Sequence, residues 1–271
     1  MPRGVASRSA QRRDGSPFED LIAIEEPLEI RVASEPVSIT MRTPGDDARL
    51  AVGFLFAEGI VRSAADLGTV AHCGRPGDEG YGNVIDVTPA AGARLPLERA
   101  DAARRGTLTT AACGVCGRRQ IDDLLARVPT LTVAPGVVSA KLLLEAPGRL
   151  AALQQNFSRT GGVHAAVALA PDGGLLAGHE DVGRHNAVDK VVGELVLSGR
   201  LGRAALLMVS GRSSFEIIQK AAMAGVPVVA SVSAASSLSI DLAQRAGITL
   251  VAFVRGEGFN VYTHPSRLTA S

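Results

Sequence analysis

Short apolar runs that alternate with segments of helical spacing constrain the fold of the second half of this chain. Each run is the length of a buried strand, and the apolar residues between the runs recur every three or four positions. We place strands at 163–169, 204–209, 226–232 and 249–254, and helices at about 186–197, 215–224 and 237–246. Such alternation predicts an α/β fold with a mostly parallel sheet and right-handed crossovers.

The first half has a different pattern. Residues 28–32 and 37–41 alternate apolar and polar side chains, which predicts a hairpin, and a helical stretch follows over 50–60. Further strand candidates lie near Val70 and at 84–87. We therefore expect a smaller α+β domain over 18–138 and the α/β domain over 139–271.

Residues 1–17 are rich in arginine, and we expect them to form a disordered basic tail. The Arg12-Arg13 pair is typical of a twin-arginine export signal, but acidic residues follow it where such a signal needs an apolar stretch. The longest stretch without a polar side chain, 221–230, is half the ~20 residues that a membrane span requires. We expect a cytoplasmic protein that does not cross a membrane.

The charge balance excludes a broad class of partners. The 28 lysines and arginines nearly cancel the 27 aspartates and glutamates, so no overall field attracts nucleic acid. The chain has no tryptophan and two tyrosines, and so offers few side chains on which bases could stack. We expect no nucleic-acid partner.

The most reactive feature of the sequence is a cysteine pair, Cys113 and Cys116, flanked by glycines and followed by Arg118-Arg119. Nearby cations and the start of a helix lower a thiol pKa and favour the reactive thiolate. Zinc is the structural alternative, but the remaining cysteine, Cys73, does not complete a four-ligand set with a second pair. An arginine-flanked loop suits sulfur-carrier chemistry better than it suits thioredoxin-like thiol–disulfide exchange.

Three loops of similar chemistry follow predicted strands of the second half. Because ligands bind where the carboxyl ends of parallel strands meet helix N-termini, these loops should lie at one edge. Serine capping of helices would explain either serine loop alone. Together with two arginines, the three loops favour a site for an anion with several phosphates. The residues concerned are Ser210, Gly211, Arg212, Ser231, Ser233 and the stretch Phe253, Val254, Arg255, Gly256, Glu257 and Gly258.

A second dense patch flanks the strand predicted at 163–169. Thr160-Gly-Gly-Val-His164 precedes it, and a block of ionisable residues from His179 to Lys190 follows a Pro171-Asp-Gly-Gly turn. A solvated helix start would explain the charges of the block. It does not explain two glycine-bearing turns that each carry a histidine, and we add His164 and Arg184 to the predicted binding site.

Taken in order, these motifs resemble the formate dehydrogenase accessory sulfurtransferases, from about residue 20 to His264. The long block from Glu180 to Lys190, in register with the cysteine loop, is the most specific part. The motifs are Met41-Arg-Thr-Pro-Gly-Asp-Asp, Cys113-Gly-Val-Cys-Gly, Thr160-Gly-Gly-Val-His, Glu180-Asp-Val-Gly-Arg-His-Asn-Ala-Val-Asp-Lys, Ser210-Gly-Arg-Ser-Ser and Phe253-Val-Arg-Gly.

The resemblance implies a cytoplasmic homodimer that takes sulfur from a cysteine desulfurase as a persulfide. The acceptor would be the molybdenum of Mo-bis(molybdopterin guanine dinucleotide), which formate dehydrogenase requires. Carried over, Cys113 is the carrier, Cys116 supports it, and residues 253–258 bind the cofactor. The resemblance also implies a cytidine-deaminase-like second domain, with the cysteine loop on the first domain.

Two other functions compete with this interpretation. Zinc deaminases carry His-x-Glu before a Pro-Cys-x-x-Cys, whereas His164-Ala-Ala lacks the glutamate and the cysteine pair comes before it. Deamination is therefore disfavoured. A non-catalytic chaperone that binds the cofactor and uses the cysteines as structural zinc ligands is the main alternative.

Overall fold

The computed structural model describes residues 4–75, 77–78, 80–96, 128–132 and 134–269. Its helices are α1 (Asp47–Ala57), α4 (Ala140–Leu153), α5 (Gln155–Thr160), α6 (Arg184–Leu197), α7 (Phe215–Met223) and α8 (Ser237–Ala246), with short 3-10 turns at Ala64–Asp66 and Pro265–Arg267. Its strands are β1 (Val5–Gln11), β2 (Pro17–Ala23), β3 (Glu26–Val32), β4 (Glu35–Arg42), β5 (Leu67–His72), β6 (Val84–Pro89), β7 (Val138–Ser139), β8 (His164–Leu169), β9 (Leu175–Asp181), β10 (Leu206–Val209), β11 (Val228–Ser231), β12 (Thr249–Arg255), β13 (Gly258–Val261) and β14 (Leu268–Thr269). No helix in these ranges is long and apolar enough to cross a membrane.

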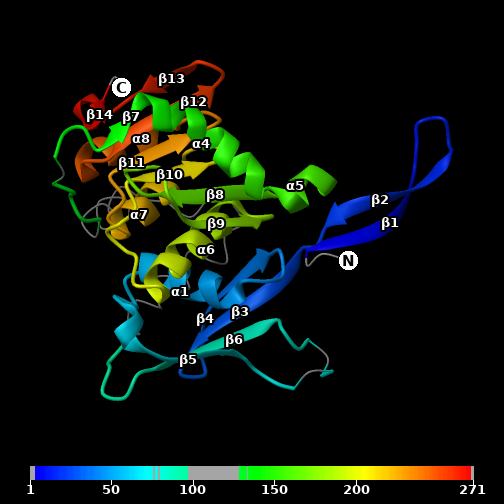
Figure 1. Ribbon diagram of the computed structural model, residues 1–271. Coiled ribbons are helices and arrows are strands. Elements are labelled where there is room, and N and C mark those ends of the chain that lie inside the picture. The colour runs from blue at the N-terminus through cyan, green and yellow to red at the C-terminus, as the bar shows by residue number, and fades with distance from the viewer. Residues whose placement is uncertain (1–3, 76, 79, 97–127, 133, 270–271) are drawn as a thin grey trace.

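A six-stranded sheet forms the centre of the second half, in the order β13-β12-β11-β10-β8-β9 (Figure 1). Successive side chains of its buried strands point to opposite faces. One face packs against α6, α7 and α8, and the other packs against α4. The predicted strands and helices of this half are confirmed to within a few residues, and the chain has a mixed α/β fold.

The prediction of a mostly parallel sheet is wrong. Only the β10–β11 and β11–β12 pairs are parallel, whereas β8 pairs antiparallel with both β9 and β10, and β13 pairs antiparallel with β12. Two tight connections cause this, because the turn at 171–174 returns the chain as β9 and the turn at 256–257 returns it as β13. Short turns of this kind join antiparallel neighbours.

A four-stranded sheet, β4-β3-β6-β5, lies in the first half and packs against α1. The predicted hairpin at 28–41 is confirmed as β3 and β4. Helix α1 also contributes Val52 and Phe56 to the core around α6. One helix therefore joins the two halves of the protein.

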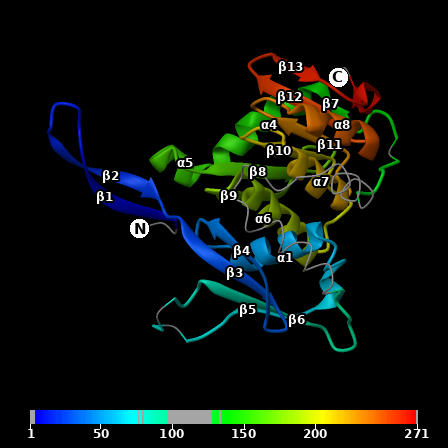
Figure 2. The same ribbon diagram turned by 180° about the vertical axis from the view of Figure 1, so that it is seen from behind.

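The expected disordered tail at 1–17 is wrong for the residues that the structure describes. β1 pairs with β2 over seven residue pairs, from Val5↔Ala23 to Gln11↔Pro17, and the hairpin projects away from the body (Figures 1 and 2). Ser7 and Ser9 donate hydrogen bonds to Glu19 across the two strands. Polar pairing of this kind leaves little apolar alternation in the sequence, so the pattern did not predict a strand.

Candidate functional site

The loops that follow β10 and β11 lie side by side at one edge of the six-stranded sheet, and the end of β12 lies against them at Phe253. The backbone amide of Ser213 donates to the carbonyl of Ala234 at 3.0 Å, and that of Ser236 donates to the carbonyl of Ser213 at 3.2 Å. The amide of Phe253 donates to the carbonyl of Ser233 at 3.0 Å. The two serine loops therefore meet as predicted, and they lie against the last strand two residues before the predicted Arg255 loop.

Several serine hydroxyls at this edge already have partners in the protein. Ser210 Oγ accepts from the amide of Ala165 at 2.9 Å, and Ser231 Oγ donates to the carbonyl of Ser233 at 2.8 Å. Ser236 caps α8. A hydroxyl that accepts one hydrogen bond can still donate its own proton, so Ser210 remains able to donate to an anion.

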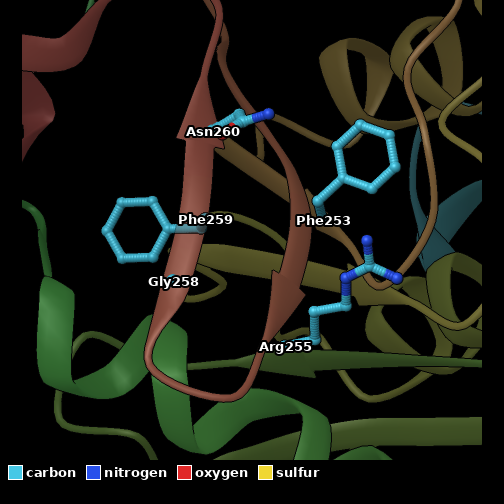
Figure 3. A pocket seen from close by; sticks show the side chains of 5 residues that line it. All are labelled: Phe253, Arg255, Gly258, Phe259 and Asn260. Carbon is cyan, nitrogen blue, oxygen red and sulfur yellow. The ribbon is translucent and has the colours of Figure 1, made fainter.

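An open pocket of about 480 Å³ lies at the end of β12 and the start of β13. It is lined by Phe253, Arg255, Gly258, Phe259 and Asn260 (Figure 3). The Arg255 guanidinium carbon lies 5.4 Å from the centroid of the Phe253 ring. The pocket thus places a cation and an aromatic face together on the stretch predicted to bind a cofactor.

The backbone of Phe253 adopts a left-handed conformation, with φ of 56°. The β12–β13 register shifts between Ala252 and Arg255 at this point. Left-handed backbone costs a bulky side chain energy, and such strain clusters at functional sites. The bulge places the exposed Arg255 at the edge, while Val254 keeps its side chain in the core.

His164, Arg184 and Gly211 come together beside these loops. A Cβ on Gly211 would lie 3.3 Å from His164 Nδ1 and 3.6 Å from Arg184 Cδ, so the glycine lets the loop pass closely over both side chains. Burial, and then the charge of Arg184, lowers the pKa of His164. The positive charge at this edge therefore comes from arginine and not from this histidine.

His185 is a second neutral imidazole near the same loops. Its Nε2 atom lies 2.9 Å from Ser214 Oγ and 3.5 Å from a Glu216 carboxylate oxygen. Burial lowers the pKa of His185 to about 4, against the opposing effect of Glu216. At neutral pH, His185 and Ser214 share a hydrogen bond between uncharged groups.

Two buried polar atoms of this region lack a hydrogen-bond partner within the described ranges. They are Arg184 Nε and Ser213 Oγ. A buried polar atom without a partner is costly, and at a binding site the ligand can supply the missing partner. The residues present therefore suit an anionic ligand at this edge.

The charged block from Glu180 to Lys190 is largely buried. Lys190 Nζ contacts Asp181 Oδ2 at 2.7 Å and donates to the carbonyl of Thr43 at 3.0 Å, while Asn186 donates to the carbonyl of Met41 at 2.8 Å. The block therefore ties the end of β4 to α6. These charges are therefore not explained by a helix start that is simply exposed to solvent.

Cys113 and Cys116 lie outside the described residues, so their roles remain predictions. Cys73 is a half-buried free thiol. His72, beside it, directs Nε2 toward Asp47 Oδ2 at 3.3 Å. Within the part of the chain that the structure describes, no group of three or more His, Cys, Asp or Glu side chains could hold a metal ion.

Sequence reasoning missed Phe259 and Asn260 as lining residues. They follow the glycine that ends the Arg255–Gly258 turn, and the antiparallel return of β13 brings them back beside Phe253. The signal was available in the two closely spaced glycines, Gly256 and Gly258, which indicate a tight turn after the last strand.

Comparison with known proteins gives a consistent result. A model of the FdhD/NarQ family matches residues 23–269. A protein named Sulfur carrier protein FdhD from Anaeromyxobacter sp. (strain K) is 55% identical, covering 98% of this chain and 95% of the relative, and a protein of the same name from Streptomyces coelicolor is 47% identical, covering 94% and 92%. A crystal structure described as a formate dehydrogenase accessory protein from Desulfotalea psychrophila matches with a TM-score of 0.74 and 26% identity, covering 98% of both chains.

Proposed function

Because this chain belongs to the FdhD/NarQ family, we propose that it is a cytoplasmic sulfur carrier that serves formate dehydrogenase. In this proposal Cys113 accepts sulfur from a cysteine desulfurase as a persulfide. The acceptor is Mo-bis(molybdopterin guanine dinucleotide), bound as a substrate at the edge formed by the loops after β10 and β11 and the end of β12.

The observation that carries the proposal is the convergence of these loops beside the Phe253–Arg255 pocket. The proposed substrate carries two pyrophosphates and therefore needs several donors in one place. Backbone amides at helix starts and the side chains of Arg184, Arg212 and Arg255 supply donors of the right kind. The neutral state of His164 and His185 leaves the arginines as the cations of the site.

Sulfur chemistry is assigned to the cysteine pair. The Cys113 thiolate takes a sulfur atom from the persulfide of the desulfurase, whose cysteine leaves as a thiolate. In delivery, the S–S bond of the Cys113 persulfide breaks, Cys113 keeps the bonding electron pair, and the sulfur is transferred to the metal, which supplies the two electrons. Cys116 supports the carrier.

The experiment is to incubate the protein with a desulfurase and cysteine and to measure its intact mass. We expect the mass of one added sulfur atom on the Cys113 peptide, its loss in Cys113→Ala, and its retention in the control Cys73→Ala. Cys113→Ala should also fail to activate formate dehydrogenase in cells that lack the native protein. Full activation by Cys113→Ala would disprove the carrier role and favour a cofactor-binding chaperone.

A further inference from the structure

Helix α1 begins at a turn that contacts one histidine from each half of the protein. The helix lies between the four-stranded sheet and α6 (Figures 1 and 2). Its first residue, Asp47, contacts His72 at the end of β5, with 3.3 Å between Oδ2 and Nε2. The preceding residue, Asp46, contacts His179 of β9, with 3.3 Å between Oδ2 and Nδ1. Two adjacent aspartates therefore tie the start of α1 to both sheets.

Both imidazole rings face oxygen acceptors through both of their nitrogens. The Nδ1 atom of His72 lies 3.2 Å from the carbonyl oxygen of Val84, and the Nε2 atom of His179 lies 2.6 Å from a carboxylate oxygen of Glu194. Carbonyl and carboxylate oxygens accept hydrogen bonds and do not donate them. A neutral imidazole has one N–H donor, whereas the imidazolium has two. Only the protonated ring can therefore donate to both of its neighbours at the same time.

The contact between His179 and Asp46 lies among further charged groups. Besides the carboxylates of Asp46 and Glu194, cations face it from α1, α6 and the turn after α6: Arg49, Lys190 and Arg200. The hydrogen bond from His179 is the largest effect that lowers the pKa of Asp46 to about 2. This carboxylate thus stays ionised near neutral pH, where histidine is the side-chain type that ordinarily changes charge.

The contact between His72 and Asp47 has a more permanent neighbour. Arg42 is buried and donates to both oxygens of Asp47 at 3.0 Å, so this carboxylate is paired whether or not the histidine carries a proton. The ring of Tyr81 lies beside His72, with 6.2 Å between the ring centroids. By contrast, the pair of Asp46 with Arg49 is half-exposed, and such pairs are weak. The contact of Asp46 therefore depends more on the proton.

The turn also supports the corner between β9 and α6. The amide of Thr43 donates to Asp181 Oδ2 at 3.2 Å, and its hydroxyl accepts from the amide of Val182 at 3.0 Å. Asp46 has a left-handed backbone, with φ of 58°. Surrounding contacts must hold a residue other than glycine in this conformation. Loss of the contact of Asp46 would therefore loosen both the start of α1 and the corner that leads to Arg184.

We propose that His72 and His179 form a latch that protons close. With both rings protonated, their N–H groups fix the turn at 43–47 against both sheets. As pH rises and the rings lose their protons, one nitrogen of each ring turns a lone pair toward an oxygen, and the turn opens more often. The latch is closed at lower pH and opens at higher pH. It concerns the join between the two halves and does not depend on sulfur transfer.

The test is hydrogen exchange of backbone amides, measured by NMR on the full chain between about pH 6 and about pH 9, while the imidazole nitrogen signals report the charge of each ring. The amide of Leu50 donates to the carbonyl of Asp46 at 3.0 Å and is the reporter. The amide of Ile240 donates to the carbonyl of Ser236 at 3.1 Å, at the start of α8, and is the internal control.

We expect the protection factor of Leu50 to fall roughly tenfold relative to that of Ile240, as for one charged hydrogen bond at a half-exposed carboxylate. The fall should coincide with the loss of protons from His72 and His179. Unchanged protection of Leu50 while both rings lose their protons would overturn the proposal. So would two rings that are neutral over the whole pH range.

The variant Asp46→Asn separates the latch from other effects of pH. Asparagine tolerates the left-handed backbone, and its amide can donate to a ring that has lost its proton. The fall at Leu50 should therefore shrink in Asp46→Asn and vanish in Asp46→Asn/His72→Gln. His264→Gln is the control and should keep the whole fall, because His264 contacts the carbonyl of Gln244 in α8. An undiminished fall in Asp46→Asn would contradict the latch.

Discussion

Gly53 of α1 and Gly193 of α6 lie against each other where the two helices cross. A Cβ on Gly53 would fall 1.8 Å from the carbonyl oxygen of Asp189, and one on Gly193 would fall 1.9 Å from that of Arg49. Real Cβ atoms do not approach so closely. The two halves of the protein are therefore joined through direct contact of two helix backbones.

We expect Gly53→Ala or Gly193→Ala to lower the free energy of unfolding by at least about 1 to 3 kcal/mol, because the helices must separate to admit the methyl group. Gly148→Ala, in α4, is the control. Its Cβ meets open space, so the better helix propensity of alanine should raise stability by about 0.5 to 1 kcal/mol. Urea unfolding measures all three, and equal effects at the three positions would contradict the close contact.

A second prediction concerns pH. The pKa of His185 is lowered to about 4 in the folded protein, against about 6.5 unfolded, so the unfolded chain binds the proton first. Its contribution to stability is complete above about 6.5 and is lost as pH falls toward 4. His185→Gln should remove on the order of 2 kcal/mol of the decline in stability between pH 7 and pH 5.

The pH dependence of the wild type must be compared with that of His185→Gln, because the Asp189 carboxyl changes stability with pH in the opposite direction. Burial raises its pKa to about 6, so its contribution is lost as pH rises through 6. An NMR titration of the imidazoles gives the direct check. A His185 that titrates above pH 6 would show that the ring is not held in its neutral form.

A third prediction isolates backbone strain at the pocket. Phe253 has φ of 56°, where glycine is relaxed and alanine is strained. Both Phe253→Gly and Phe253→Ala lose the ring, but we expect the glycine variant to be more stable by about 1 kcal/mol. Chemical unfolding of the two variants measures the difference. An alanine variant as stable as the glycine variant would mean that the bulge relaxes once the ring is removed.

The sequence predicted the strands that build the sheet edge and, from them, the loops that meet there. It did not predict the burial of the block around Lys190, because its partner Thr43 contributes a backbone carbonyl from 147 residues away. A carbonyl has no signature in the sequence. β9 was missed for a related reason, since its residues Gly178, His179 and Glu180 interrupt the apolar alternation of a strand.

The last prediction tests whether substrate binding and sulfur carriage are separate. GDP, as a fragment of the proposed substrate, should bind at the Phe253–Arg255 pocket, and calorimetry should show affinity reduced roughly tenfold to a hundredfold in Arg255→Ala, since a charged hydrogen bond contributes about 1.5 to 3 kcal/mol. Arg149→Ala, which removes an exposed arginine paired with Glu145 on α4, is the control and should bind normally.

Cys113→Ser should keep full GDP affinity, whereas Arg255→Ala should still accept sulfur from the desulfurase, because each change removes one step only. Neither variant should activate formate dehydrogenase. If Cys113→Ser abolishes GDP binding while its circular dichroism spectrum is unchanged, the cysteine loop is part of the pocket. If Arg255→Ala and Arg212→Ala both bind GDP as the wild type does, the phosphates lie away from this edge of the sheet.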